Sequence, residues 1–252
     1  MEHLTTARNI NNVDLDPSAI FPFALDAFQI EAIDALIQGH SVVVSAPTGS
    51  GKTLIGEYAI HRAIAHKQKV FYTTPLKALS NQKLRDFRKQ FGFGNVGLMT
   101  GDFSVNREAS IVIMTTEIFR NMLYAEGDEI DDPLADVETV VLDECHYMND
   151  AQRGTVWEES IIHCPPSVQI VALSATVANA GQLTDWIQQV HGPTHLVSSN
   201  FRPVPLRYLF CSAKGLHPLL NDEGNGLHPN CKVWRAPKGY KRKGRSSKPP
   251  QP

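Results

Sequence analysis

The sequence has little of what would place it among secreted, disulfide-bonded or membrane-spanning proteins. Its 252 residues include only four cysteines, Cys145, Cys164, Cys211 and Cys231, with no C-x-x-C pair. Their irregular spacing favours free thiols in a reducing compartment over a disulfide framework. No apolar run approaches the roughly 20 residues of a membrane helix, and residues 1–8 lack the apolar segment of a signal peptide. We therefore expect a soluble, cytoplasmic protein.

Acidic residues are missing from the C-terminal part of the chain. Residues 224–252 hold eight of the 24 lysines and arginines and none of the 26 acidic residues, so they carry a charge of +8 and residues 1–223 a charge of −10. The net charge of −2 therefore says little about nucleic-acid binding, which must depend on a local surface. Residues 238–252 are basic, polar and rich in proline at their end. We expect them to form a disordered tail, with nonspecific contact to phosphates as the alternative.

Strand-like apolar runs alternate with amphipathic stretches of helical spacing through most of the chain. We expect strands at Ser41–Ala46, Lys69–Thr73, Val96–Met99, Ile111–Thr115, Thr139–Leu142, Gln169–Ala172 and His195–Val197. We expect helices at Ala27–Ile37, Thr53–His66, Leu76–Phe91, Glu117–Tyr124, Thr155–His163 and Gly181–Val190. This alternation predicts an α/β fold with a mostly parallel sheet and helices on both faces. Ligands of such sheets bind at the carboxyl ends of the strands.

A phosphate-binding loop is predicted where the first strand runs into a helix, at Ala46-Pro47-Thr48-Gly49-Ser50-Gly51-Lys52-Thr53. A strand–loop–helix of this kind places backbone N–H groups and a helix N-terminus around one anion. We expect Lys52 to reach the β- and γ-phosphates of a nucleoside triphosphate and the Thr53 hydroxyl to hold Mg²⁺. Alanine stands at position 46, where the P-loop pattern has glycine. A glycine turn that only caps a helix is the structural alternative.

Two carboxylates follow the expected strand Thr139–Leu142. Asp143 can hold the Mg²⁺ that bridges the phosphates, and Glu144 can orient and deprotonate the attacking water. Polar residues often end strands, so the pair alone does not indicate a catalytic site. It does so here because it follows a phosphate-binding loop in a parallel α/β pattern. We therefore expect Lys52, Asp143 and Glu144 to act in catalysis.

With these two sites the sequence resembles the superfamily-two helicases. Asp143-Glu144-Cys145-His146 matches their DExH box, and Ala46–Thr53 resembles their motif I, in which alanine is common. Gln29 resembles the upstream glutamine that reads the adenine edge, although alone it would read as a surface residue, and Phe21 or Phe23 could stack on the base. The resemblance implies a RecA-like P-loop NTPase domain that uses ATP and Mg²⁺. It implies nucleotide contacts by Gln29, Thr48, Gly49, Ser50, Gly51, Lys52 and Thr53, with Thr53 and Asp143 as the metal ligands.

Further signatures of the family follow in its order. Thr74–Leu79 resembles motif Ia, Thr100-Gly101-Asp102 a loop on the same track, and Thr115-Thr116-Glu117 motif Ib. Alone, Thr74–Leu79 could be a helix start, because threonine caps helices and proline opens them, and Thr115-Thr116-Glu117 could be a helix cap with an acid in the first turn. In the family these segments line the backbone of one nucleic-acid strand, which is recognised largely without regard to base sequence. The implied contacts are Pro75, Leu76, Lys77, Gly101, Thr115 and Thr116.

Ser174-Ala175-Thr176 resembles motif III, which couples hydrolysis to strand movement; alone it could be a loop of small residues. The resemblance implies coupling roles for His146, Ser174 and Thr176. Phe201–Leu206 is similar to the exit from the first RecA-like domain in the superkiller-like branch of RNA helicases. We therefore expect a flexible N-terminal segment at 1–19, a helicase ATP-binding domain at 20–210, and an irregular linker with the basic tail at 211–252.

The resemblance implies one half of a two-domain motor. In the family, ATP is hydrolysed between two RecA-like domains, and residues 177–252 are too few for a second one. We expect the ATP-binding domain of an ATP-dependent RNA helicase, as a fragment that lacks the second domain and is weakly active or inactive by itself. RNA is the expected strand rather than DNA. A DNA helicase or translocase of the same superfamily and a non-catalytic regulatory half-helicase that binds nucleotide and RNA are the alternatives.

Overall fold

The computed structural model describes residues 15–124, 133–150, 152–212, 215–228 and 231. By its internal contacts the chain divides into two units, residues 1–203 and 204–252. The disordered tail predicted at 238–252 lies outside the described residues, as do the first 14 residues of the predicted flexible N-terminal segment.

Within its described residues the first unit contains one eight-stranded sheet with the strand order β4-β3-β5-β2-β6-β7-β1-β8. All neighbouring strands are parallel except β3 and β4. The strands are β1 (Ser41–Ser45), β2 (Lys69–Thr74), β3 (Val96–Met99), β4 (Ser104–Val105), β5 (Ile111–Thr115), β6 (Val137–Leu142), β7 (Gln169–Ser174) and β8 (Thr194–Ser198).

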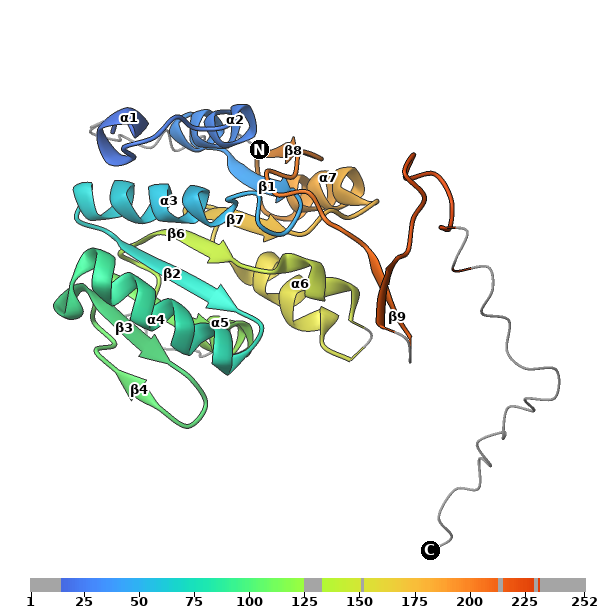
Figure 1. Ribbon diagram of the computed structural model, residues 1–252. Helices are drawn as coiled ribbons and strands as arrows, with labels where there is room; N and C mark the ends of the chain where they lie inside the picture. The colour runs from blue at the N-terminus through green and yellow to red at the C-terminus, as the bar shows by residue number, and fades with distance from the viewer. Residues whose placement is uncertain (1–14, 125–132, 151, 213–214, 229–230, 232–252) are drawn as a thin grey trace, which may run out of the picture. The chain divides into compact units, whose positions relative to one another are not determined.

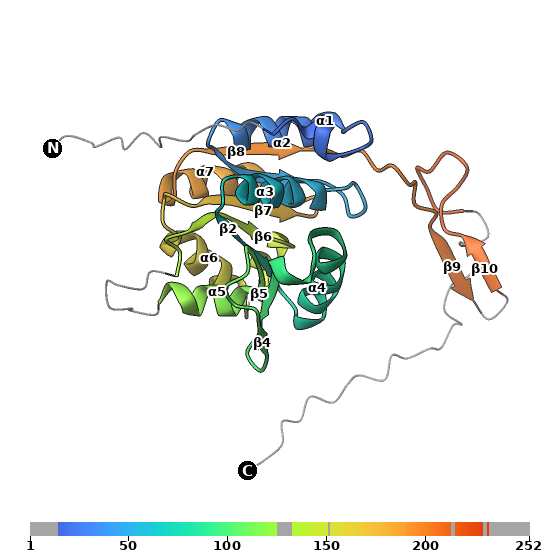
Figure 2. The ribbon, with the colours of Figure 1, turned by 90° about the vertical axis from the view of Figure 1, so that its left-hand side faces the viewer.

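Helices cover both faces of this sheet. Figure 2 shows α4 on one side of β2 and β5, with α5 and α6 on the other side. One core cluster joins α2, α3 and α4 to the sheet, and a second joins α5, α6 and α7 to its opposite face. The helices are α1 (Pro17–Ile20), α2 (Ala27–Ile37), α3 (Thr53–Ala65), α4 (Lys77–Phe91), α5 (Thr116–Leu123), α6 (Gly154–His163) and α7 (Ala180–Val190).

The central strands are apolar on both faces because both faces are covered. Val44 and Tyr72 pack in the first cluster, and their neighbours Val43 and Phe71 pack in the second. Successive side chains of a strand point to opposite faces, so a strand buried on both sides reads as a continuous apolar run. The predicted α/β class, with a mostly parallel sheet and helices on both faces, is confirmed.

A buried ion pair fixes the far end of α3 beneath the sheet. Arg62 donates from Nε to Glu138 Oε1 at 2.8 Å, and its other nitrogens donate to the Leu36 carbonyl at 2.6 Å and to Gln169 Oε1 at 2.5 Å. Both charged side chains are almost fully buried. Removing one partner from a pair like this leaves an uncompensated charge, at a cost of about 3–5 kcal/mol. The helix that begins at the phosphate-binding loop is therefore held firmly at its other end.

The expected strands and helices are confirmed to within two residues at each end. The elements of the first unit that the sequence did not predict are short. The strand β4, helix α1 and the 3₁₀ turns η1 (Phe93–Asn95) and η2 (Cys145–Asn149) span two to five residues each. Elements of that length carry no readable hydrophobic period. Helix α1 overlaps the end of the N-terminal segment 1–19 that we expected to be flexible, and there the Asp16 side chain accepts a hydrogen bond from the Ser18 backbone N–H at 2.9 Å.

The second unit contains an antiparallel pair, β9 (Leu209–Ser212) and β10 (Gly215–Pro218). This differs from the irregular linker expected to begin at 211, because Ser212 pairs with Gly215 and Leu209 with Pro218. The internal contacts divide the chain between residues 203 and 204. The functional boundary at residue 210 remains a prediction. In the part of the chain that the structure describes, no helix has both the length and the apolar character needed to cross a bilayer.

Ile60 and Ile64 on α3 provide a matched test of this packing. Ile60 is fully buried, whereas Ile64 is 37% exposed. We expect Ile60→Ala to lower the free energy of unfolding by about 2–5 kcal/mol, because it opens a cavity between helix and sheet. Ile64→Ala should cost well under half of that. Urea unfolding of both variants measures the difference, and equal losses would contradict the assigned helix face.

Candidate nucleotide-binding site

Most of the predicted site residues lie in the loops at the carboxyl edge of the sheet or at the ends of the strands and helices that these loops join. Figure 1 shows β1, β2, β6 and β7 pointing to the same side. The phosphate-binding loop follows β1, the DExH box follows β6, and Ser174 is the last residue of β7. The segments resembling motifs Ia and Ib follow β2 and β5. Parallel pairing has therefore gathered segments that are up to 130 residues apart at the edge where such sheets bind ligands.

The loop between β1 and α3 depends on two glycines. Gly49 and Gly51 have φ angles of +83° and +87°, which residues with a side chain rarely adopt. A Cβ at position 51 would also lie 2.8 Å from Gln29 Nε2, so an added side chain would displace the amide end of Gln29. Helix α3 begins at Thr53, immediately after the loop. The first turn of α3 can therefore present its backbone N–H groups to an anion held by the loop.

Lys52 is held across its own loop. Its Nζ donates hydrogen bonds to the carbonyl oxygens of Ala46 at 2.8 Å and Pro47 at 2.9 Å. Burial lowers the pKa of Lys52, Arg202 lowers it further, and the carboxylates of Glu144 and Asp143 oppose this shift. A phosphate oxygen is a charged and therefore stronger acceptor than a backbone carbonyl. An arriving phosphate can thus draw the ammonium group away from the loop.

The donor set around this loop fits a nucleotide with bound Mg²⁺. Ser50 is buried, and among the described residues its hydroxyl finds no hydrogen-bond partner, which is unusual for a buried polar atom. Thr53 and Asp143 supply the hard oxygen ligands that Mg²⁺ prefers. Lys83 Nζ lies 3.4 Å from Thr53 Oγ1 and 3.7 Å from Asp143 Oδ2. The two predicted metal ligands therefore already face a single positive charge.

The two carboxylates of the DExH box are held differently. Asp143 accepts hydrogen bonds at Oδ2 from the Tyr72 hydroxyl (2.7 Å) and at Oδ1 from the Glu144 backbone N–H (2.9 Å). Burial and the Asp143 carboxylate raise the pKa of Tyr72 well above its usual value, so its hydroxyl remains a donor. Glu144 has φ +55° and ψ +41°, a left-handed conformation that is costly for a residue with a side chain. Backbone strain of this kind is concentrated at functional sites.

Gln29 is part of the loop's support. It is 5% exposed, its Oε1 accepts a hydrogen bond from the Asp26 backbone N–H at 2.9 Å, and its Nε2 donates to the Gly51 carbonyl at 3.2 Å. The expected contact of Gln29 with adenine stays a prediction. Of the two candidates for base stacking, Phe21 is buried and Phe23 is 58% exposed. Exposure therefore favours Phe23 over Phe21.

The loops expected to contact nucleic acid touch each other. Lys77 Nζ and Asp102 Oδ1 form an exposed ion pair at 2.6 Å, which joins the segment after β2 to the segment after β3. The hydrogen bond from Lys77 is the main cause that lowers the pKa of the Asp102 carboxyl. Leu76 and Gly101 are exposed beside this pair, while Pro75 is buried. Exposed backbone and basic groups of this kind suit contact with phosphates rather than with bases.

Thr115 and Thr116 occupy a different environment from the other predicted nucleic-acid contacts. Both side chains are buried, and the Thr116 hydroxyl donates to the Thr74 carbonyl at 3.3 Å. The hydroxyl therefore links the loops after β2 and β5. At this end of α5, which begins at Thr116, partial exposure starts only at Glu117 and Ile118.

Arg153 was not singled out in the sequence, yet it connects three of these segments. Its guanidinium donates to the Pro75 carbonyl at 2.6 Å and to the Glu117 carboxylate, and it lies over the Trp157 ring. The arginine stands just before α6, which follows the DExH box in the chain. It therefore ties the polypeptide that leaves the nucleotide site to the loops of the expected nucleic-acid track. No local spacing rule identifies such a residue, because its partners are distant in sequence.

The predicted coupling residues lie between the DExH box and the end of β7. His146 Nδ1 is 3.2 Å from Glu144 Oε2 and 3.4 Å from the Ala175 backbone nitrogen. A protonated Nδ1 can donate to Glu144, whereas an unprotonated Nδ1 can accept from Ala175, so the ring can serve one neighbour at a time. Ser174 is buried, and its carbonyl accepts a hydrogen bond from the Ala46 backbone N–H at 3.2 Å. Thr176 is exposed.

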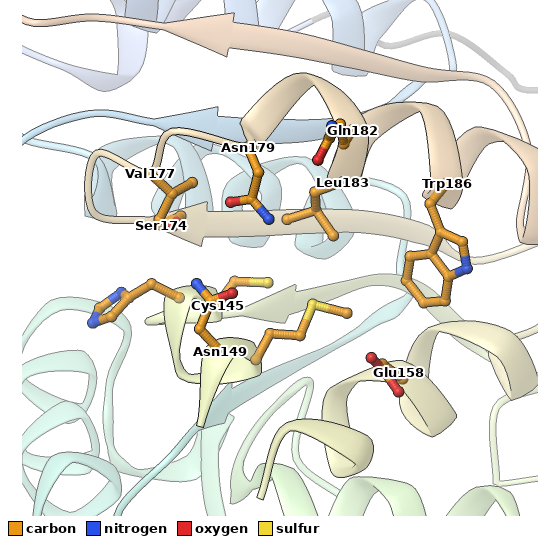
Figure 3. A pocket seen from close by; sticks show the side chains of 11 residues that line it. Cys145, Asn149, Glu158, Ser174, Val177, Asn179, Gln182, Leu183 and Trp186 are labelled. Atoms are coloured by element: carbon orange, nitrogen blue, oxygen red, sulfur yellow. The ribbon is translucent and has the colours of Figure 1, made fainter. Parts of the chain in front are cut away.

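A cavity of about 270 Å³ opens beside these residues. Figure 3 shows Ser174, Val177, Asn179 and Leu183 facing Cys145 across it. The cavity is lined by the DExH segment on one side and by β7 and α7 on the other. Burial raises the pKa of the Cys145 thiol to about 12, so this sulfur stays neutral and acts as packing.

Comparison with known proteins identifies similar chains. A family model described as DEAD/DEAH box helicase matches residues 26–183. The chain is 53% identical over 218 residues to the DExH-box ATP-dependent RNA helicase DExH15 of Arabidopsis thaliana, covering 85% of this chain and 19% of that protein. It is 48% identical over 213 residues to the human exosome RNA helicase MTR4, covering 83% and 20%. The chain therefore spans about a fifth of the length of these relatives.

Solved structures share the fold. The helicase Lhr of Mycobacterium smegmatis, bound to single-stranded DNA and AMP-PNP, matches with a TM-score of 0.58 and 27% identity, over 72% of this chain and 26% of that one. The DUF1998 helicase MrfA, bound to DNA and AMPPNP, matches with a TM-score of 0.60 at 22% identity, over 74% of this chain and 28% of that one. The RecA-like architecture expected from the sequence is thereby confirmed.

Gly51 and Gly39 provide a matched test of the phosphate-binding loop. Both have positive φ angles, +87° and +86°, but a Cβ at position 39 would meet open space. We expect each alanine variant to lose about 1–2 kcal/mol of stability from the left-handed conformation. Only Gly51→Ala should also weaken nucleotide binding, by tenfold or more, because its Cβ displaces Gln29. Thermal unfolding and titration with a fluorescent ADP measure the two effects; a Gly51→Ala protein that binds as well as Gly39→Ala would contradict the assigned loop.

Proposed function

The chain belongs to the DEAD/DEAH box helicase family, and we propose that it is the ATP-binding first RecA-like domain of a superkiller-like RNA helicase. In this proposal, ATP binding and hydrolysis are coupled to the binding and unwinding of RNA. The observation that carries it is the convergence of Thr53 and Asp143 on one cation position beside the phosphate-binding loop. A glycine turn that only caps a helix would give no reason for that convergence.

Different residues would bind the phosphates, hold the metal ion and activate the attacking water. Backbone N–H groups of residues 49–53 and the Lys52 ammonium would hold the phosphates, and Arg202, which donates to the Thr48 carbonyl at 3.0 Å, adds positive charge beside the loop. Thr53 and Asp143 would hold Mg²⁺, which supplies charge neutralisation on the phosphate oxygens. Glu144 would orient the attacking water and accept its proton. His146 contacts both the Glu144 carboxylate and Ala175 in the middle of the Ser174–Thr176 segment, so it would relay a change at the nucleotide.

The strand is proposed to be RNA, bound through its backbone. Support comes from the relatives named as RNA helicases, which are about half identical to this chain. The exposed Lys77 ammonium and the exposed backbone at Gly101 offer contacts to phosphate rather than to bases. The 2′-hydroxyl is the group that would favour RNA over DNA.

A second RecA-like domain is proposed to complete the motor. The chain spans about a fifth of the length of its relatives, which is room for one domain of such a motor. In related NTPases an arginine supplied from outside the phosphate-binding domain raises turnover by roughly 10³–10⁵-fold. We therefore propose that this chain binds Mg·ATP by itself but hydrolyses it slowly.

Glu144→Gln tests the hydrolytic role. We expect the variant to bind a fluorescent ATP analogue within about threefold of the unaltered chain, because the phosphate and metal contacts remain. Its single-turnover hydrolysis, measured with the protein in excess and single-stranded RNA present, should fall by at least about tenfold, since general-base catalysis contributes roughly 10²–10⁴.

Glu108→Gln is the matched control. Glu108 is exposed and pairs with Lys69, the first residue of β2, away from the site. The loss of the Glu108 charge should leave both nucleotide binding and turnover unchanged. Equal turnover in the Glu144→Gln and Glu108→Gln proteins would contradict the assignment of Glu144 as the base.

Competition between matched RNA and DNA strands tests the choice of nucleic acid. We expect an RNA oligonucleotide to displace a labelled strand from the chain, in the presence of a non-hydrolysable ATP analogue, at several-fold lower concentration than the DNA of the same sequence. Equal or stronger displacement by DNA would favour a DNA helicase, the activity suggested by the similarity to the DNA-bound Lhr structure.

A further inference from the structure

Lys83 occupies the position at which the two predicted metal ligands meet. It lies on α4, and its Nζ is 3.4 Å from Thr53 Oγ1 and 3.7 Å from Asp143 Oδ2. Thr53 opens α3 and Asp143 follows β6, so three separate elements converge on this ammonium group. The Lys83 side chain is only 19% exposed. Its position is therefore set by packing and is not that of a mobile surface lysine.

The surroundings of Lys83 suit a cation. Its ammonium lies 5.0 Å from the centre of the Tyr72 ring and 5.6 Å from that of the Phe87 ring, within the range at which aromatic faces attract positive charge. Tyr72 also donates its hydroxyl to Asp143 Oδ2 at 2.7 Å. The aliphatic stem of a lysine can pack along such apolar rings while its charged end reaches the carboxylate. Aromatic rings and a carboxylate thus place one positive charge beside the phosphate-binding loop.

The charges around Lys83 indicate what its ammonium group does at this site. Asp143 and Glu144 are adjacent carboxylates, and the Lys52 ammonium is engaged by the carbonyl oxygens of Ala46 and Pro47. Lys83, by contrast, lies within hydrogen-bonding range of Thr53 Oγ1 and within ion-pairing range of Asp143 Oδ2. A divalent cation held by Thr53 and Asp143 would repel an ammonium group at the same place. The two cations cannot share these oxygens at the present distances.

We propose that Lys83 is the resident counter-cation of the magnesium site: it neutralises Asp143 while the metal is absent and gives way when the metal binds with nucleotide. The inference rests on the proposed function, because it takes Thr53 and Asp143 as the metal ligands. Lys83 competes with the metal and not with the nucleotide. In metal-free protein its charge also substitutes in part for that of Mg²⁺ near the phosphates.

Lys83 therefore weakens the coupling between Mg²⁺ and nucleotide. Removing its charge should make metal-free nucleotide binding weaker and metal binding to the nucleotide complex tighter. Both changes raise the ratio of the nucleotide Kd in EDTA to the nucleotide Kd in Mg²⁺. Because binding linkage is reciprocal, the same factor appears whichever ligand is titrated.

The test is a titration of the full chain with a fluorescent ADP, in EDTA and in Mg²⁺. We expect Lys83→Met to raise the ratio of the two Kd values by about tenfold, a typical size for coupling between sites. Lys83→Arg, which keeps the charge, should stay near the unaltered ratio. Lys89→Met is the matched control, because Lys89 is an exposed lysine on the same helix.

Metal binding provides a second readout that does not depend on activity. Mn²⁺, followed by its paramagnetic resonance signal, should bind the ADP complex of Lys83→Met several-fold more tightly than the unaltered complex. If Lys83→Met does not fold, Lys83→Gln serves in the same two titrations. An unchanged or smaller Kd ratio, or weaker Mn²⁺ binding, would overturn the role of Lys83. Absence of nucleotide binding by the unaltered chain in both media would instead overturn the proposed function, and this inference with it.

Discussion

The structure depends on one constraint, the parallel alignment of strands that are covered on both faces. Parallel strands end at the same edge, so the loops after β1, β2, β5, β6 and β7 meet there although they are distant in sequence. The two apolar clusters hold this alignment, with Val43 and Val44 in opposite clusters. Both faces of the central strands are apolar, so the close packing of the particular side chains in each cluster holds the strands in place. The chemistry of the site is thus positioned by the core beneath it.

Hydrogen bonds tie the segments of the expected nucleic-acid track to one another and to the chain that follows the DExH box. The Thr116 hydroxyl binds the Thr74 carbonyl, and Arg153 binds the Pro75 carbonyl and the Glu117 carboxylate. On the other side, the Ala46 backbone N–H donates to the Ser174 carbonyl. In the proposed function, Arg153 would carry a displacement of the chain after the DExH box to the track, and Ser174 would carry one of the phosphate-binding loop to the end of β7. Coupling of two ligands needs such an element that both can bias.

The sequence predicted the parts of the site that local patterns encode. The loop at 46–53, Asp143 at the end of its strand and the order of the later motifs all depend on neighbouring residues, and the fold brings them to one edge as expected. Lys83 and Arg153 escaped prediction because each is a polar residue on or beside a helix, and its partners lie in other elements. The burial of the Thr115 and Thr116 side chains could not be foreseen either, because it depends on packing against the loop after β2. Short elements such as β4 carry too few residues to show a period.

Hydrogen–deuterium exchange of the chain with and without a magnesium-bound ATP analogue tests the central claim most directly. The account predicts slower exchange in two separate segments, residues 48–54 and residues 143–146, because one ligand contacts both. Residues of the second unit, 204–252, should exchange as before. Saturating ligand that leaves both segments unchanged, or that slows exchange only at another edge of the sheet, would contradict the assignment of this edge as the nucleotide site.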